Sequence, residues 1–247
     1  MSASLWSILI SGGMLGWALI ARRLLVNPRG DVETGIFWHL CRWYARLWHG
    51  LRVEGLENLP TELHPGPLVV VCNHTAGVDP LLVQSVALFE IRWMMGKDMM
   101  APALAGFWRW SGVIEVDRLG TDRRSARDAL AHLKSGGVLG VFPEGRLERP
   151  PRHVLPFLPG VGLIVARSGA RVLPFVVDGT PDVGPAWASL IKRSRSRVRV
   201  MPAIDYAGVD AGAIVEDLRR RYVRWTGWPR EDHPQALRPR ILAQTPA

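Results

Sequence analysis

Short runs of β-branched and aliphatic residues alternate along this chain with segments that have helical character. The run at residues 67–73, PLVVVCN, is typical of a strand buried on both faces. Alternating strands and helices predict an α/β fold, with a mixed, largely parallel sheet flanked by helices. The expected strands are at residues 67–73, 91–95, 113–116, 138–142 and 171–177, and the expected helices at residues 79–88, 101–110, 121–133, 160–167 and 209–227.

Composition narrows the class of protein. The chain has 247 residues, of which 48% are hydrophobic and 21% charged. These values are close to those of ordinary globular domains, so most of the chain is not intrinsically disordered. Its two cysteines, Cys41 and Cys72, exclude a disulfide-stapled scaffold. No CxxC or paired-histidine spacing accompanies them, so we expect no metal site.

The charge balance indicates an anionic partner. Lysine and arginine number 31 against 22 acidic residues, which gives a net charge of +9. Such a surplus is typical of proteins that meet nucleic acid, an acidic membrane surface or a phosphorylated substrate. Eleven tryptophans also suit either a membrane interface or nucleic-acid stacking. The basic stretch 192–199 is either a solvated strand face or a contact for anionic lipid or the nucleotide part of a substrate, with nucleic acid a third reading.

The beginning of the chain favours the membrane. Residues 1–21 contain no charged side chain, and Arg22 and Arg23 follow directly. As a helix, residues 5–21 would cover roughly 26 Å, near the lower limit for crossing a bilayer. Because the positive charge follows the apolar run, we expect a retained anchor with the rest of the chain on the cytoplasmic side. A helix lying in one leaflet is the alternative.

A second segment supports this expectation. Apolar residues recur at three- and four-residue steps from Ile36 to Leu51, and basic residues lie between them. The pattern predicts a basic amphipathic helix at a membrane interface. The alternative is an ordinary helix packed on the core.

The chain therefore divides into five parts. They are a membrane anchor helix at residues 1–27, an amphipathic interfacial helix at 33–51, an α/β domain at 52–205, a C-terminal helix at 206–228 and a poorly ordered tail at 229–247. A bacterial cytoplasmic membrane, with the α/β domain facing the cytoplasm, is the expected location.

Candidate catalytic residues follow the first buried strand. Residues 73–79 read NHTAGVD, and a loop at the carboxyl edge of a sheet is where α/β proteins place ligands. If Asp79 bonds one ring nitrogen of His74, the other nitrogen becomes a suitable base for a substrate hydroxyl. Backbone N–H groups after His74 are candidate donors to an oxyanion. The chain lacks GxSxG, HExxH, GxGxxG and GxxxxGK[ST] motifs, so nothing indicates a serine nucleophile of the α/β-hydrolase kind.

Further blocks follow in a characteristic order. After NHxxxxD come GVIEVDR at residues 112–118, FPEG at 142–145 and a VLPF strand at 172–175. The combination resembles the glycerolipid acyltransferase family, whose best-known members are 1-acylglycerol-3-phosphate acyltransferases. The resemblance covers roughly residues 51–205.

The resemblance implies a role for each matching residue. His74 would deprotonate the acceptor hydroxyl, which attacks the thioester of acyl-CoA or acyl-carrier protein directly, and Asp79 would orient His74. Arg118 would hold an anionic headgroup, and Glu144 and Gly145 would shape the acceptor site. The other residues with implied substrate contacts are Asn73, Lys97, Gly112, Asp117, Pro143, Arg146 and Arg149. For Lys97, a solvated side chain is the alternative.

The implied partners are membrane phospholipids, the acyl donor and a lysolipid acceptor, with no nucleic acid. No cofactor is expected beyond the co-substrate.

The sequence departs from the family pattern after FPEG. Many members have an arginine two positions after the glycine, whereas here Arg146 follows Gly145 at once. Either Arg146 or Arg149 takes that role, or the contact is lost. The resemblance makes 1-acylglycerol-3-phosphate the default acceptor. Because the phosphate contact is altered, the alternatives are another lysophospholipid, an amino-acid lipid or another hydroxyl- or amine-bearing molecule. A catalytically silent lipid- or donor-binding protein on the same fold is the rival hypothesis.

Overall fold

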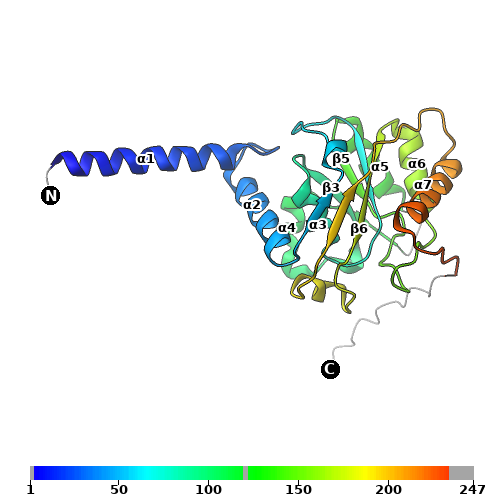
Figure 1. Ribbon diagram of the computed structural model, residues 1–247. Helices are drawn as coiled ribbons and strands as arrows, with labels where there is room; N and C mark the ends of the chain where they lie inside the picture. Colours follow the sequence, from blue (N-terminus) through cyan, green and yellow to red (C-terminus); the bar gives the residue numbers. More distant parts are fainter. Residues whose placement is uncertain (1–2, 119–121, 234–247) are drawn as a thin grey trace, which may run out of the picture.

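A seven-stranded sheet forms the centre of the molecule. The computed structural model describes residues 3–118 and 122–233 (Figure 1). The strands lie in the order β1-β7-β6-β2-β5-β3-β4. Their bounds are β1 (Arg52–Glu54), β2 (Leu68–Cys72), β3 (Ile91–Gly96), β4 (Ile114–Val116), β5 (Val138–Val141), β6 (Arg171–Asp178) and β7 (Arg197–Val200). Strand β7 pairs antiparallel with β6 and parallel with β1, and the other pairs are parallel.

Helices cover both faces of this sheet. The α-helices are α1 (Ala3–Leu25), α2 (Val32–Leu47), α3 (Asp79–Val86), α4 (Ala105–Ser111), α5 (Arg123–Lys134), α6 (Pro159–Ser168) and α7 (Ala211–Thr226). Figure 1 shows α2, α3 and α4 on one side of the sheet and α5, α6 and α7 on the other. The predicted α/β fold, with a mixed and largely parallel sheet between helices, is confirmed.

Strand β2 supplies apolar side chains to both layers of the core. Val69 and Val71 belong to the cluster with α5, α6 and α7, whereas Val70 and Cys72 belong to the cluster with α2 and α3. All four side chains are fully buried. Because successive side chains of a strand point to opposite faces, an uninterrupted apolar run is what a strand covered on both sides requires.

The predicted helix at residues 101–110 is shorter than expected. Short 3-10 turns at Lys97–Met99 and Pro102–Leu104 precede α4. Proline lacks a backbone N–H and disfavours helical geometry in the residue before it, so the α-helix begins only after Pro102.

The first residues of the tail that was expected to be poorly ordered are bonded to the domain. Val154 N–H donates to the carbonyl of Pro229, and Glu231 N–H donates to the carbonyl of Val154. Residues 234–247 of that predicted tail lie outside the described residues.

Helix α1 projects from the domain and meets it only near its end (Figure 1). A Cβ at Gly35, in the first turn of α2, would lie 2.0 Å from the Leu24 carbonyl oxygen. Glycine therefore permits the close approach of the two helices. None of the helices in residues 3–118 and 122–233 has the length and apolar character needed to cross a bilayer.

Candidate active site

The loop between β2 and α3 brings His74 and Asp79 together. The Nδ1 atom of His74 lies 3.0 Å from Oδ2 of Asp79. Asp79 is completely buried, whereas the side chain of His74 is 19% exposed. An ionised carboxylate only accepts hydrogen bonds, so this contact places the ring proton on Nδ1 and leaves Nε2 with its lone pair. Nε2 makes no hydrogen bond with the part of the chain that the structure describes.

Asp79 also fixes the backbone of this loop. Its Oδ2 accepts hydrogen bonds from the N–H groups of Thr75 at 2.7 Å and Ala76 at 2.8 Å, and its Oδ1 accepts from the Thr75 hydroxyl at 3.0 Å. These bonds satisfy buried donors and hold the carboxylate toward the imidazole. The N–H groups of Thr75 and Ala76 are thus engaged by Asp79, so any oxyanion donor from this loop has to come from the N–H groups closer to α3.

Asn73 joins the ends of two strands. Its amide nitrogen donates to the Val177 carbonyl and its amide oxygen accepts from the Val177 N–H, both at 2.8 Å. The side chain thereby continues the pairing of β2 with β6 beyond the last backbone pair, Cys72 with Phe175. With both amide groups used and the side chain fully buried, Asn73 sets where the His74 loop begins.

An aromatic stack supports the imidazole. His74 lies on Phe142 with ring centroids 3.9 Å apart, and Phe142 lies on Trp93 at 4.7 Å. Phe142 comes directly after β5, and Trp93 lies in β3. The stack covers one face of the His74 ring and keeps the ring nearly parallel to that of Phe142. Within this plane, the hydrogen bond to Asp79 sets the direction in which Nδ1 points.

The loop after β5 connects the separate sequence blocks. The Glu148 N–H donates to the carbonyl of His74 at 2.8 Å. The Arg118 guanidinium donates to the Gly145 carbonyl at 3.1 Å and also bonds Asp98. Gly145 adopts a φ of +65°, which favours glycine. One loop therefore holds both the His74 segment and the arginine of the second block.

Two glutamates of this loop are buried. Burial raises the pKa of Glu144 well above its usual value, and the nearby Glu148 raises it further. Burial also raises the pKa of Glu148 to about 8, although the Arg152 N–H bond opposes this. Neither carboxyl oxygen of Glu144 makes a hydrogen bond of normal geometry with the described residues. Burial therefore favours the protonated, neutral form of both carboxyl groups.

Three basic residues that were predicted to contact the substrate lie in different surroundings. Lys97 lies 3.9 Å from Glu115, and both are exposed. Arg149 bonds Asp182 at 3.1 Å, which ties it to the loop after β6. Arg146 is half-buried.

The other predicted residues shape the backbone around the site. Gly112 ends α4 with a φ of +63°. Asp117 N–H donates to Asp122 at 2.7 Å. The Pro143 carbonyl accepts from Leu158 N–H at 2.7 Å.

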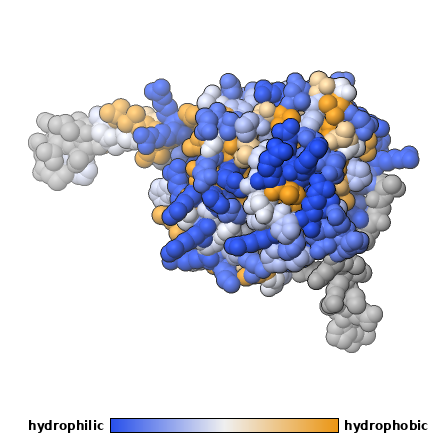
Figure 2. All heavy atoms as spheres, turned by 45° about the vertical axis from the view of Figure 1, so that its right-hand side comes forward, coloured by the Kyte–Doolittle hydropathy of each residue, from blue (hydrophilic) through white to orange (hydrophobic). Residues whose placement is uncertain are grey.

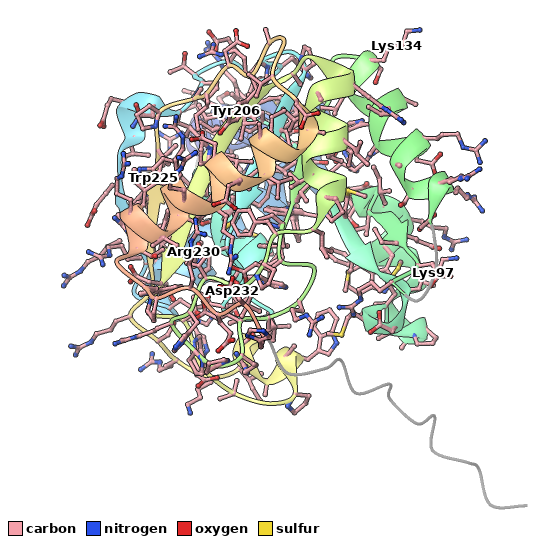
Figure 3. All side chains as sticks on the ribbon, turned by 90° about the vertical axis from the view of Figure 1, so that its right-hand side faces the viewer. Lys97, Lys134, Tyr206, Trp225, Arg230 and Asp232 are labelled. Atoms are coloured by element: carbon pink, nitrogen blue, oxygen red, sulfur yellow. The ribbon has the colours of Figure 1, made fainter. Side chains whose placement is uncertain are left out.

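Some residues of the site gave no sequence signal. The Thr75 hydroxyl lies 2.5 Å from that of Thr180, which joins the His74 loop to the loop after β6. On the far side of the FPEG loop, buried Arg219 of α7 donates to the carbonyls of Val154 and Leu155, both at 3.1 Å. Its Nη1 lies 2.6 Å from Asp232, and Figure 3 shows Asp232 beside α7. Because these contacts join distant segments, only the folded structure reveals them.

No metal-binding arrangement lies among residues 3–118 and 122–233, in the sense that no three His, Cys, Asp or Glu side chains are placed to hold an ion.

Known proteins with similar sequences are acyltransferases. A chloroplastic 1-acyl-sn-glycerol-3-phosphate acyltransferase of Brassica napus is 27% identical over 72% of this chain and 53% of its own length. The chain thus spans about half the length of that relative. A 1-acyl-sn-glycerol-3-phosphate acyltransferase of Bacillus subtilis is 25% identical over 70% of this chain and 86% of its own length.

A solved structure has the same fold. The 1-acyl-sn-glycerophosphate acyltransferase PlsC of Thermotoga maritima superposes with a TM-score of 0.66 at 20% identity, covering 87% of this chain and 88% of that one. The sequence model of the family named Acyltransferase matches residues 50–178, which include His74, Asp79, Arg118 and the FPEG loop. The chain belongs to the Acyltransferase family.

Proposed function

We propose that this protein transfers a fatty acyl group from acyl-CoA or acyl-carrier protein to the hydroxyl of a lysophospholipid, with 1-acylglycerol-3-phosphate as the first candidate acceptor. The observation that carries the proposal is the His74 imidazole, bonded at Nδ1 to the buried Asp79 and left with Nε2 unbonded at the carboxyl edge of the sheet. The names of the relatives support the choice of acceptor.

The reaction needs no acyl-enzyme. Nε2 of His74 accepts the proton of the acceptor hydroxyl as its oxygen attacks the thioester carbonyl carbon. The negative charge of Asp79 stabilises the resulting imidazolium. When the tetrahedral intermediate collapses, the carbon–sulfur bond breaks and the imidazolium returns its proton to the leaving thiolate. The products are the acylated lipid and a free thiol.

Arg118 is the proposed contact for the acceptor phosphate. Its guanidinium is fixed by Asp98 and Gly145, so it is already oriented before the ligand arrives. Arginine suits this role because its planar donors match phosphate oxygens. Lys97 and Arg146 would add positive charge on the same side of the site. Asn73, Gly112, Asp117 and Pro143 act as positioning residues in this proposal.

The protein meets its lipid substrates at a membrane surface. Residues Ile36, Leu40, Trp43 and Leu47 of α2 are exposed, whereas Trp38, Cys41 and Ala45 pack inward. The apolar stripe predicted from the sequence is therefore not covered by the core, which argues against an ordinary packed helix. We propose that α1 and α2 lie on the membrane, the cytoplasmic face of a bacterial membrane being the proposed location.

The proposal is tested by following product formation. Detergent-solubilised protein is given palmitoyl-CoA or palmitoyl-carrier protein with a panel of lysophospholipids that differ in headgroup, and the lipid products are identified by mass spectrometry. We expect acceptor-dependent release of thiol together with a diacylated product. Binding of donor and acceptor without any product would contradict the proposal and favour the silent binding protein.

A further inference from the structure

The most exposed large apolar side chains of the described residues come from two distant segments. Ile191 is 77% exposed and Leu47 is 74% exposed. Ile191 follows the short helix η4 (Ala186–Leu190), and Leu47 ends α2. Figure 1 shows η4, in yellow, beside the lower end of α2. We call the surface formed by Leu47, Trp48, Ile191, Lys192 and Arg193 the edge patch.

The two halves of the edge patch are bonded to each other. Trp48 Nε1 donates to the carbonyl of Ile191 at 3.2 Å, and the guanidinium of Arg193 lies 4.8 Å from the centre of the Trp48 ring. The Tyr44 hydroxyl donates to the Leu190 carbonyl at 2.5 Å. The patch is thus a built surface, not a flexible loop that happens to expose an isoleucine.

The edge patch lies at the same edge of the sheet as His74. Strand β7 runs antiparallel to β6, and its first residue, Arg197, pairs with Asp178 at the carboxyl end of β6. The segment just before β7 therefore lies where β6 and its parallel neighbour β2 end and where β1 begins. A direct contact confirms this placement, because a Cβ at Gly77, three residues after His74, would lie 2.6 Å from the Ala186 carbonyl oxygen.

The charge of this surface has one sign. No acidic residue occurs between Glu33 and Glu54 or between Asp182 and Asp205. Lys192 and Arg193 form no ion pair with any residue that the structure describes. By contrast, the face on the side of α6 and α7 is mostly hydrophilic, as Figure 2 shows. Isolated exposed apolar residues are common. A cluster that joins exposed tryptophan, leucine and isoleucine to basic residues without acidic partners is instead typical of a membrane interface.

We propose that the edge patch binds the surface of an anionic phospholipid bilayer and turns the His74 edge of the sheet toward the lipid. This contact extends that of α1 and α2 to the segment before β7, with Leu47 common to both, and it rests on the proposed function only in needing a membrane. Ile191 and Leu47 would enter the headgroup region, and Lys192 and Arg193 would meet lipid phosphates. The lipid acceptor would then reach Nε2 of His74 without crossing water.

Site-specific fluorescence tests the contact directly. Both native cysteines are buried, and burial raises the pKa of Cys41 to about 12, so an introduced exposed cysteine takes the label selectively. An environment-sensitive probe is attached to Ile191→Cys, to Leu40→Cys on α2 and to Leu56→Cys. Leu56 is 56% exposed and follows the end of β1 that is farther from the edge patch, so it serves as the control position. Vesicles of phosphatidylcholine with and without phosphatidylglycerol are then added.

We expect a blue shift at position 191 and at position 40 with phosphatidylglycerol vesicles, and none at position 56. A shift at position 40 without one at position 191 would overturn the proposal while leaving membrane binding by α2 intact. No shift at either position would refute both. A shift at position 191 that grows with protein concentration in the absence of vesicles would assign the surface to a second copy of the chain and also overturn it.

A charge-reversal pair gives an independent measurement. The variant Lys192→Glu/Arg193→Glu is compared with Arg167→Glu/Arg171→Glu, which makes the same change in net charge at exposed positions near the start of β6. We expect affinity for the anionic vesicles to fall at least tenfold in the first variant and less than threefold in the second. Equal losses would mean that net charge alone matters and would overturn the proposal. Vesicle binding decides these outcomes even if the protein transfers no acyl group.

Discussion

Asp79→Asn isolates the charge of the carboxylate from its hydrogen bonds. An asparagine oxygen in the place of Oδ2 still accepts from His74 Nδ1, Thr75 N–H and Ala76 N–H, and its NH₂ group faces the Thr75 hydroxyl, which can accept. The loop and the tautomer of His74 should therefore persist. What disappears is the negative charge that stabilises the imidazolium once His74 has taken the proton.

The size of the loss follows from Coulomb's law. Opposite charges about 4 Å apart interact by about 4 kcal/mol at an effective dielectric constant near 20, and about 1.4 kcal/mol corresponds to a tenfold change in rate. Allowing for relaxation of the surroundings, we expect kcat to fall by about 100- to 1,000-fold. Because the substituted group lies beneath the histidine and not in the substrate path, KM should change less than threefold.

Thiol release from palmitoyl-CoA in the presence of 1-acylglycerol-3-phosphate measures this loss. The matched control is Asp128→Asn, which makes the same chemical change at an exposed site on α5. The melting temperature reports whether each variant folds. A folded Asp79→Asn protein with kcat within threefold of the wild type would refute the assigned role of Asp79.

Three further substitutions test the buried groups. With its pKa raised to about 8, Glu148 is protonated in the folded protein while the unfolded chain loses that proton near pH 4.5, so its contribution to stability is complete below pH 4.5 and is lost as the pH rises toward 8. Glu148→Gln should remove on the order of 3 kcal/mol of this pH dependence, measured by urea unfolding between pH 5 and 8. Tyr222→Phe removes a buried hydroxyl that donates to Val71 and should lower the free energy of unfolding by about 1–2 kcal/mol without changing KM. Arg219→Met removes the donor to the Leu155 carbonyl, in the segment between FPEG and α6, and one of the donors to the Val154 carbonyl; it should lower the free energy of unfolding by about 2–4 kcal/mol and raise KM, in steady-state kinetics, more than Tyr222→Phe does.

The central strands could be predicted because their signal is local. The runs at residues 67–73, 138–142 and 171–177 become β2, β5 and β6 within one or two residues at each end. Burial on both faces demands apolar side chains throughout, which makes these strands visible in the sequence. The edge strand β1 has three residues with exposed, partly charged side chains, so its sequence does not distinguish it from a loop. Only its pairing with β7 in the folded protein identifies it as a strand.

The site was predictable only in part. His74 and Asp79 are five residues apart, so one loop and the start of one helix bring them together. The stacking of Phe142 on His74 and the bond from Glu148 to the His74 carbonyl instead depend on β5 lying next to β2. A sequence pattern marks such residues as a block but does not state which atoms they contact.

The role of His74 as general base is tested by comparing the wild type with His74→Ala. Free thiol release is followed with palmitoyl-CoA, first without and then with a lysophospholipid acceptor. We expect release by the wild type only when the acceptor is present, with no stoichiometric burst beforehand, and a rate about 1,000-fold lower for a folded His74→Ala protein, within the roughly 100- to 10,000-fold contribution of a general base. Full activity of His74→Ala, or a burst of thiol from the wild type without acceptor, would contradict the proposed mechanism.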